Sequence, residues 1–274
     1  MGIITNIGQS HVGRLGTREA IAQTKAELLE HLPAEGVAVL NADDFFFSVF
    51  EAMAPCRVVS FGLGEQAQVR AEEIANHDLD RVAFRLVSPA GAADVAMPVP
   101  GRHNVLNALA AAAAALELGA GLEEIAAGLA VHEGTAMRLQ RVAGRGGSTI
   151  INDAYNASPD SVAAALRVLG AATGRRIFVF ADMLELGREA EAAHREVGEL
   201  VARSGVHRLI AVGELAALAA ERAGELGVRA EAVADARAAA ALLAGELGPE
   251  DTVLVKGSRA MRLERVVEAL ADDH

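Results

Sequence analysis

The sequence predicts an α/β protein of two domains, and three observations carry this prediction. The chain has 274 residues, which corresponds to about two domains of ordinary size. Apolar residues make up 52 % of the chain and charged residues 23 %, as in globular proteins with a buried core. In the second half, short apolar runs alternate with segments of helical length, a pattern typical of a parallel sheet covered by helices.

The expected elements of the first domain, residues 1–135, follow from apolar runs and their polar ends. Residues 2–7 predict a buried strand, Thr17 is a suitable N-cap for a helix to about residue 31, and residues 37–40 predict a second strand. Glycines and prolines then separate short β-rich segments, and glycines at 119 and 121 separate two helices. These strands cover residues 58–61, 68–74, 81–87 and 94–97, and the helices cover residues 100–118 and 122–131.

The second domain, residues 136–274, is expected after a boundary at residues 132–137. A hairpin around residues 144–147 joins strands over 139–143 and 149–152. Helices over 160–172, 189–204, 214–224, 236–245 and 259–270 then alternate with strands over 177–181, 208–212, 229–233 and 252–256. Strands separated by single helices imply right-handed crossovers, so we expect a Rossmann-like domain with a mainly parallel sheet.

Composition excludes several classes of protein. The formal net charge of −12 argues against nucleic acid as a partner. A single cysteine, Cys56, excludes an internal disulfide and a multi-cysteine zinc site. No run reaches the roughly 18 consecutive apolar residues of a membrane span, and the first residues lack the basic leader of a signal peptide. We therefore expect a cytoplasmic protein without membrane insertion.

Two common phosphate-binding motifs are absent from the sequence. It contains no G-x-x-x-x-G-K-[ST] loop and no G-x-G-x-x-G segment between a strand and a helix. A Rossmann-like sheet without that fingerprint is weak evidence for a dinucleotide enzyme. Polar clusters at strand ends are better guides, because open α/β sheets bind ligands beyond the carboxyl ends of their strands.

Two such clusters lie in the first domain. His11 ends the polar segment after the first strand, and Lys25 follows fourteen residues later on a helix. Taken alone, a histidine such as His11 is more often a surface or capping residue than a ligand, and Lys25 would be a solvated residue of its helix. Asn104 and Asn107 are three residues apart on one helical face, so their amides could read the edge of a purine. N-terminal capping by Asn104 explains that spacing equally well.

Two further clusters lie in the second domain. Residues 151–159 combine a strand end, the single tyrosine and a helix start, although a turn that only initiates a helix would look the same. Lys256 ends a buried strand that opens toward Arg259 and an expected helix N-terminus. Helix N-termini attract anions, so a phosphate or carboxylate is expected there. Lys25 and Lys256 are the two lysines among 25 basic residues, a bias consistent with a genome that favours arginine codons.

Together these clusters resemble the Mur ligase family. Its landmarks occur in order along nearly the whole chain, as TNIGQSHVGRLGT, TKAELLE, NADD, PGRHNVLNALAA, NDAYNASPDS, ADMLELG and VKGSRAMRLE. NDAYNASP with ADMLELG resembles the branch that adds a dipeptide, and the D-N-P-R motif of a neighbouring branch is absent. The resemblance implies that residues 1–135 form the C-terminal part of an ATP-binding central domain and that residues 136–274 form a C-terminal ligase domain.

The resemblance also implies roles for individual residues. Lys25 matches a catalytic lysine that becomes a carbamate and helps to hold Mg²⁺, which a guanidinium could not do, and His11 matches a histidine near a second magnesium. The residues that match ATP-binding positions are Asn104 and Asn107, for adenine, and Arg138 and Asp153, for phosphate or ribose. The positions that match the binding region of the acceptor peptide and the incoming dipeptide are Tyr155, Asn156, Lys256, Ser258 and Arg259.

The implied reaction joins D-alanyl-D-alanine to UDP-N-acetylmuramoyl-tripeptide in peptidoglycan synthesis, with ATP and Mg²⁺ required. The family's uridine-nucleotide domain, P-loop lysine and metal-binding glutamate have no counterpart in these 274 residues. We therefore expect an N-terminally truncated chain that is inactive by itself, with the missing half as a candidate partner. Two alternatives remain open, namely another Mur- or folate-type amide ligase and a non-catalytic module that binds a nucleotide or a dipeptide.

Overall fold

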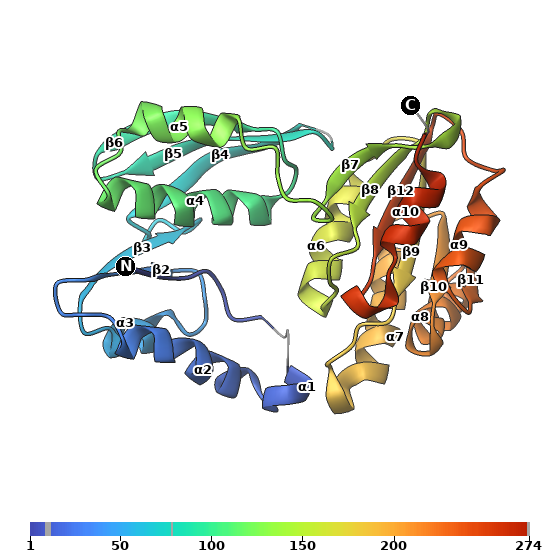
Figure 1. Ribbon diagram of the computed structural model, residues 1–274, viewed down its shortest axis with the longest axis horizontal. Coiled ribbons are helices and arrows are strands. Elements are labelled where there is room, and N and C mark those ends of the chain that lie inside the picture. The colour runs from blue at the N-terminus through green and yellow to red at the C-terminus, as the bar shows by residue number, and fades with distance from the viewer. Residues whose placement is uncertain (9–11, 78, 273–274) are drawn as a thin grey trace. The chain divides into compact units, whose positions relative to one another are not determined.

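The computed structural model describes residues 1–8, 12–77 and 79–272, which divide into two compact units (Figure 1). The first unit contains residues 1–8 and 15–133, and the second contains residues 12–14 and 134–272. Residues 12–14 belong to the short helix α1 (Val12–Leu15), and the amide of Gly13 donates to the carbonyl of Glu185 at 2.7 Å. This bond explains why that short segment groups with the second unit.

The first unit is built on a six-stranded mixed sheet. Its order is β1 (Gly2–Ile4), β2 (Val37–Asn41), β3 (Arg57–Gly62), β4 (Val69–His77), β5 (Arg81–Ser88) and β6 (Gly91–Met97). Strands β1 to β4 pair in parallel, whereas β4, β5 and β6 pair antiparallel. Strand β1 therefore forms one edge of the sheet, and Ile3 on it is 40 % exposed.

Four helices pack against this sheet. Helix α2 (Arg18–Glu30) contacts β1, α3 (Phe47–Met53) contacts β2, α4 (Arg102–Glu117) covers β2 to β5, and α5 (Leu122–Ala130) covers β6. The fully buried side chains of Phe61, Leu86 and Leu109 lie in the core between sheet and helices. Helix α2 begins as the sequence predicts, because the Thr17 hydroxyl accepts a hydrogen bond from the Ala20 amide at 3.1 Å.

The second unit is a six-stranded sheet between two layers of helices. Its order is β11 (Arg229–Val233), β10 (Arg208–Val212), β9 (Arg175–Ala181), β12 (Asp251–Lys256), β8 (Thr149–Asp153) and β7 (Gln140–Ala143). All neighbours pair in parallel except β7, which forms the expected antiparallel hairpin with β8 around the 3₁₀ turn η1 (Arg145–Gly147). The expected α/β class with a mainly parallel second sheet is confirmed.

The direction of the crossovers explains the two helical layers of the second unit. From β8 to β11 each connection moves the same way across the sheet, through α6 (Pro159–Gly170), α7 (Ala190–Arg203), preceded by the 3₁₀ turn η2 (Gly187–Glu189), and α8 (Glu214–Glu225). After β11 the chain returns to β12, so right-handed crossovers place α9 (Ala236–Leu243) on the opposite face, where it packs with α10 (Glu264–Leu270). The direction of travel thus reverses after the edge strand β11, and the returning chain places β12 in the middle of the sheet, between β9 and β8.

One predicted helix is shorter than expected. Residues 259–261 form the 3₁₀ turn η3 (Arg259–Met261), and α10 begins only at Glu264. The two are separated because Arg262 adopts a left-handed conformation with φ of 52°. Lys256 and Arg259 therefore do not flank a helix N-terminus, and the anion-binding argument from a helix dipole is wrong at this place.

Among the described residues, no helix has both the length and the apolar character that crossing a membrane would require.

Candidate functional site

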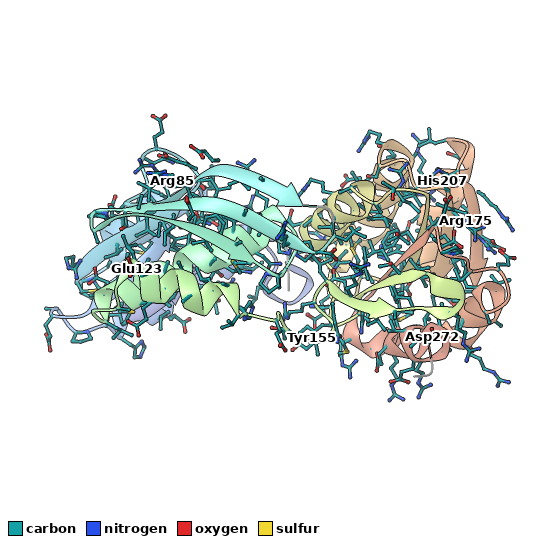
Figure 2. The ribbon with its side chains drawn as sticks, turned by 90° about the horizontal axis from the view of Figure 1, so that it is seen from above. Arg85, Glu123, Tyr155, Arg175, His207 and Asp272 are labelled. Carbon is teal, nitrogen blue, oxygen red and sulfur yellow. The ribbon has the colours of Figure 1, made fainter. Side chains whose placement is uncertain are left out.

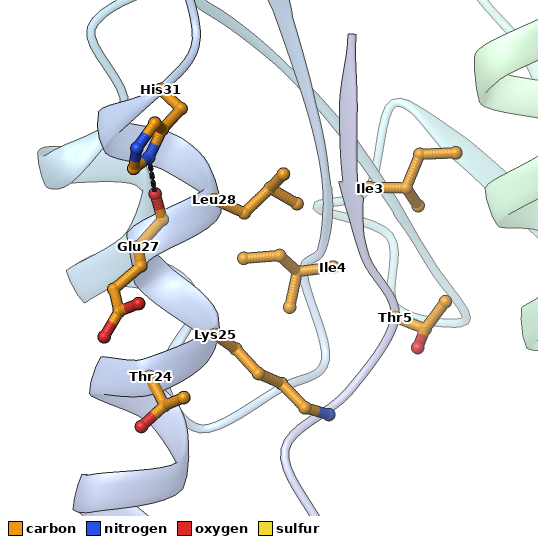
Figure 3. A pocket seen from close by; sticks show the side chains of 8 residues that line it. All are labelled: Ile3, Ile4, Thr5, Thr24, Lys25, Glu27, Leu28 and His31. Atoms are coloured by element: carbon orange, nitrogen blue, oxygen red, sulfur yellow. Dashed lines mark hydrogen bonds between the residues drawn. The ribbon is translucent and has the colours of Figure 1, made fainter.

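The described residues of the first unit that the sequence predicts to be functional lie at two places within that unit. Lys25 projects from α2 into a pocket of about 510 Å³ beside β1 (Figure 3). Its ammonium donates to the carbonyl of Asn6 at 2.9 Å, immediately beyond the carboxyl end of β1. The other residues lining the pocket are Ile3, Ile4, Thr5, Thr24, Glu27, Leu28 and His31. The prediction for His11 lies outside the described residues.

The described residues alone do not make a magnesium site. Across residues 1–8, 12–77 and 79–272, no three His, Cys, Asp or Glu side chains cluster as potential metal ligands. Lys25 in its ammonium form donates hydrogen bonds and cannot coordinate a cation.

The structure brings Asn104 and Asn107 together on one face of α4. The Asn104 amide donates to the carbonyl of Pro100 at 2.8 Å, and the Asn107 amide donates to the Asn104 side-chain oxygen at 3.4 Å. The N-cap of α4 is Gly101, so capping by Asn104, the alternative explanation of the spacing, is wrong. The paired amides carry both donors and acceptors at an accessible surface, as recognition of a purine edge requires.

The site residues of the second unit gather at the carboxyl edge of its sheet. Figure 2 shows Tyr155 at one end of this unit and Arg175 and His207, which mark the opposite ends of the strands, at the other. At the carboxyl edge, β8 ends in Asp153 and β12 ends in Lys256. Ligands of open α/β sheets bind at this edge beside a topological switch point. Here the switch point is at β12, because the helix that follows it, α10, lies on the opposite face of the sheet from the helices that follow its neighbours β8 and β9.

A buried ion pair lies at the centre of this edge. The Lys256 ammonium is 2.6 Å from Asp153 Oδ2 and donates to the carbonyl of Asn156 at 3.0 Å. The other oxygen of Asp153 accepts from the amide of Leu139 at 3.2 Å. Burial lowers the pKa of the Lys256 ammonium and raises the pKa of the Asp153 carboxyl, and in each case the charge of the partner opposes the effect of burial. The carboxylate expected near Lys256 is thus supplied by the protein itself.

Arg138 lies in a strained stretch of the backbone. Met137 and Leu139, on either side of it, have φ values of 60° and 51° in the left-handed region. Asp153 holds the Leu139 amide, and the amide of Tyr155 donates to the carbonyl of Met137 at 3.2 Å. The Arg138 guanidinium lies over the Tyr155 ring, 4.4 Å from its centroid. The exposed guanidinium is thereby held at the edge of the sheet.

The other predicted site residues of this unit form hydrogen bonds and an ion pair within and between neighbouring loops. The Ser258 hydroxyl accepts from the amide of Leu184 at 2.8 Å. Arg259 Nη1 pairs with Glu264 at 2.9 Å, and the same nitrogen is 3.7 Å from the sulfur of Met137. The side-chain oxygen of Asn156 accepts from the amide of Ala157 within the same turn.

Sequence reasoning missed two groups that organise this edge. Asp182 Oδ1 accepts from the amide of Ala216 at 2.7 Å, so this carboxylate caps α8 from the end of a neighbouring strand. His194 on α7 accepts from the amide of Met183 at 2.9 Å and bonds the carbonyl of Ala190 at 2.6 Å. Asp182 lies within the ADMLELG landmark and could have been singled out there, whereas His194 has no local signal.

Comparisons with known proteins match both units of the chain. One family model, described as the Mur ligase middle domain, matches residues 1–115, and a second, the Mur ligase, glutamate ligase domain, matches residues 137–259. A UDP-N-acetylmuramoyl-tripeptide–D-alanyl-D-alanine ligase of Mycobacterium tuberculosis strain H37Rv is 40 % identical over all of this chain and 58 % of its own length. The Escherichia coli K12 protein of the same name is 33 % identical over 99 % of this chain and 60 % of its own length.

A solved structure gives the same result at the level of the fold. A crystal structure of MurF from Acinetobacter baumannii superposes with a TM-score of 0.87 at 32 % identity, covering 97 % of this chain and 58 % of that one. The chain thus spans about three-fifths of the length of the proteins to which it is similar.

Proposed function

This chain belongs to the Mur ligase family, and we propose that it carries part of an ATP-dependent ligase that joins D-alanyl-D-alanine to UDP-N-acetylmuramoyl-tripeptide. One observation carries the proposal. At the carboxyl edge of the second sheet, Lys256 and Arg138 contact the loop that follows β8, and Arg259 contacts Met137 beside Arg138. These cations lie in a chain that is similar over its whole length to ligases of that name. The resemblance inferred from the sequence is thereby confirmed at the level of the family.

The proposed chemistry needs anions to be held and charge to be neutralised. The peptide carboxylate attacks the γ-phosphorus of ATP and releases ADP, and the dipeptide amine then attacks the acyl phosphate through a tetrahedral intermediate that expels phosphate. Positioning and electrostatic stabilisation supply most of the catalysis in such transfers. In this proposal Asn104 and Asn107 receive the adenine, Arg138 faces the phosphates, and Tyr155, Asn156 and Arg259 line the place for the peptides.

Within this proposal Asp153, Lys256 and Ser258 hold the site rather than contact a ligand directly. Both oxygens of Asp153 are engaged by Leu139 and Lys256, and the Ser258 hydroxyl is engaged by Leu184. Their hydrogen bonds connect three loops at the carboxyl edge. They set the position of Arg138 and of the loop that carries Arg259.

Lys25 has a separate proposed role. Its ammonium would first lose a proton to give the free amine, which would then add carbon dioxide and release a second proton to give an N-carboxylate. The cation is thus replaced by an anion with two oxygens able to ligate a cation. A carbamate would thus contribute ligands at the place where the described residues supply too few. The remaining ligands would come from outside the described residues.

The test uses a ligase completed by joining this chain to the N-terminal part of a relative. In that protein Lys25→Arg keeps the charge and the approximate length but cannot form a carbamate. We expect the rate of ADP release to fall by roughly 100-fold, the loss typical when a group that stabilises transition-state charge is removed. Glu27→Gln, which changes a neighbouring lining residue of the same pocket, is the control and should keep the rate.

Rescue of Lys25→Ala by short carboxylic acids would support the carbamate in particular. Near-normal turnover of Lys25→Arg would remove the proposed role. The 274-residue chain alone should show no dipeptide-dependent ADP release, because its sequence has no P-loop. Robust turnover by the chain alone would contradict this, and nucleotide binding without turnover by the completed protein would favour the binding-module alternative.

A further inference from the structure

The segment Thr5–Ile7 has no regular secondary structure, yet side chains form hydrogen bonds with four of its backbone polar groups. Asn41 donates to the Thr5 carbonyl at 2.9 Å, and Lys25 donates to the Asn6 carbonyl at 2.9 Å. Asp44 accepts from the Ile7 amide at 2.7 Å, and Arg18 donates to the Ile7 carbonyl at 3.0 Å. Two of these side chains, Lys25 and Arg18, come from α2, and the other two come from the last residue of β2, Asn41, and the turn that follows it.

The turn reaches this segment because β1 and β2 are parallel neighbours. Ile4 pairs with Leu40 in the register of the sheet, so the carboxyl ends of the two strands lie side by side. Asn41 is 6 % exposed, and its side-chain oxygen also accepts from the Asp43 amide at 2.9 Å, which fixes the orientation of its amide.

Asp44 bridges the turn and the segment with one carboxylate. One oxygen accepts from the Ile7 amide, and the other accepts from the amide of Phe46, two residues along its own turn, at 2.9 Å. Hydrogen bonds to an ionised carboxylate are stronger than neutral ones, so the segment is firmly tied to the end of β2. Asp43, the adjacent residue, instead accepts from the amides of Leu63 and Gly64 after β3.

The Asn6 carbonyl lies between the two residues that this turn holds. Fixing Thr5 on one side and Ile7 on the other fixes the direction of that carbonyl, and the Lys25 ammonium is bonded to it. We propose that Asn41 and Asp44 are positioning residues for Lys25, acting through the backbone of Thr5–Ile7. The functional meaning rests on the role proposed for Lys25, but the positioning itself can be measured separately.

The chain offers a direct readout, because Lys25 and Lys256 are its two lysines. Labelling with ¹³C,¹⁵N-lysine gives one set of side-chain signals for each, assigned with Lys25→Arg. Asp44→Asn replaces one acceptor oxygen by an NH₂ group that cannot accept from an amide. We expect the Lys25 side-chain signals to shift and the exchange of the Ile7 amide with solvent to accelerate roughly tenfold, as for the loss of one hydrogen bond.

Two internal controls distinguish positioning from general damage. The Lys256 signals should stay in place in Asp44→Asn, because that lysine lies in the second unit. Asp43→Asn changes the adjacent carboxylate, which holds a different loop, and should leave the Lys25 signals unmoved. If Asp44→Asn does not fold, Asp44→Ser keeps a turn-forming residue with a single acceptor oxygen and should give the same Lys25 shift.

Unchanged Lys25 signals in a folded Asp44 variant would overturn the proposal, and so would an equal shift in Asp43→Asn. Loss of ligase activity in Lys25→Arg tests the proposed function instead. The two results are independent, because a Lys25 that is positioned by this turn but plays no part in turnover would still show the predicted shift.

Discussion

His194 is fully buried, and both nitrogens of its ring are bonded to backbone groups. Nε2 accepts from the Met183 amide, so the ring proton is on Nδ1 and is donated to the carbonyl of Ala190. The ring is therefore neutral, and a second proton on Nε2 would face the Met183 amide. Burial is the main reason that the pKa of His194 lies below its ordinary value.

The lowered pKa predicts a loss of stability in weak acid. The unfolded chain takes up a proton at His194 near pH 6.5, whereas the folded chain does so only at a lower pH. The free energy of unfolding should thus fall from about pH 7.5 through about pH 6.5, until the pH reaches the folded-state pKa. His194→Gln keeps an acceptor for Met183 and a donor for Ala190, so urea unfolding should show a smaller loss between these pH values. An unchanged loss would contradict the assignment.

The Lys256–Asp153 pair predicts a different dependence. Lys256→Met leaves a buried carboxylate without its cation, which should lower the free energy of unfolding by about 3–5 kcal/mol at neutral pH. Without Lys256 the pKa of Asp153 should lie still higher, so the folded variant takes up a proton before the unfolded chain does. The stability lost in Lys256→Met is therefore expected to return in part as the pH falls.

The double variant tests whether the loss comes from the unpaired charge. Asp153→Asn in the Lys256→Met background removes that charge and keeps an oxygen for the Leu139 amide, so it should recover much of the stability. A cost for Lys256→Met near the roughly 0.5 kcal/mol of an exposed substitution would show that the pair is not buried in solution.

The Lys256–Asp153 pair shows which features of individual residues could be predicted from the sequence and which could not. Lys256 and Asp153 could each be recognised as a polar residue ending an apolar strand. Their contact could not be predicted, because 103 positions separate them and the sheet order that makes β8 and β12 neighbours is set by the packing of the whole unit. His194 gave no local signal, since its role depends on a loop eleven residues earlier.

Among the elements, the strands and helices with clear periodicity were predictable. One whole helix and the start of another helix were not. Helix α3 was missed, because Phe45, Phe46 and Phe47 in a row after a turn give no helical period. The start of α10 was placed too early, because a left-handed Arg262 has no signature in the sequence.

Helix α8 shows how one element depends on a residue from another strand. Its N-cap Gly213 has φ of 107° and no side chain, and Asp182 supplies the missing cap. A Cβ at Gly213 would lie 2.6 Å from the Asp182 carboxylate. Gly213→Ala should therefore lower the free energy of unfolding by about 2 kcal/mol or more, through backbone strain and the loss of a cap.

A matched glycine-to-alanine substitution in the same helix should instead stabilise the protein. Gly224 lies inside α8, and a Cβ there would meet no atom within 4 Å. Gly224→Ala should raise the free energy of unfolding by about 0.5–1 kcal/mol, because alanine loses less conformational freedom in a helix. Chemical denaturation of the two variants measures both effects. Similar changes in the two variants would show that Asp182 does not cap this helix.

For the whole molecule, the two units differ in how completely their sheets are covered. The second sheet has helices on both faces, and all its strands lie within residues 140–256. We predict that residues 136–274 fold without the rest of the chain, because a domain needs its own core and this unit contains one. The first sheet ends at β1, where Ile3 is 40 % exposed and the preceding Met1 is 48 % exposed, so its edge is open to pairing. Limited proteolysis should cut between residues 131 and 137, where the chain has no helix or strand and Val131 is 75 % exposed, and should leave a resistant C-terminal fragment. Residues 136–274 expressed alone should then unfold in one cooperative transition in urea. Survival of residues 1–135 with preferential loss of the C-terminal region would contradict this division, since it would mean that the open-edged sheet is the more stable of the two.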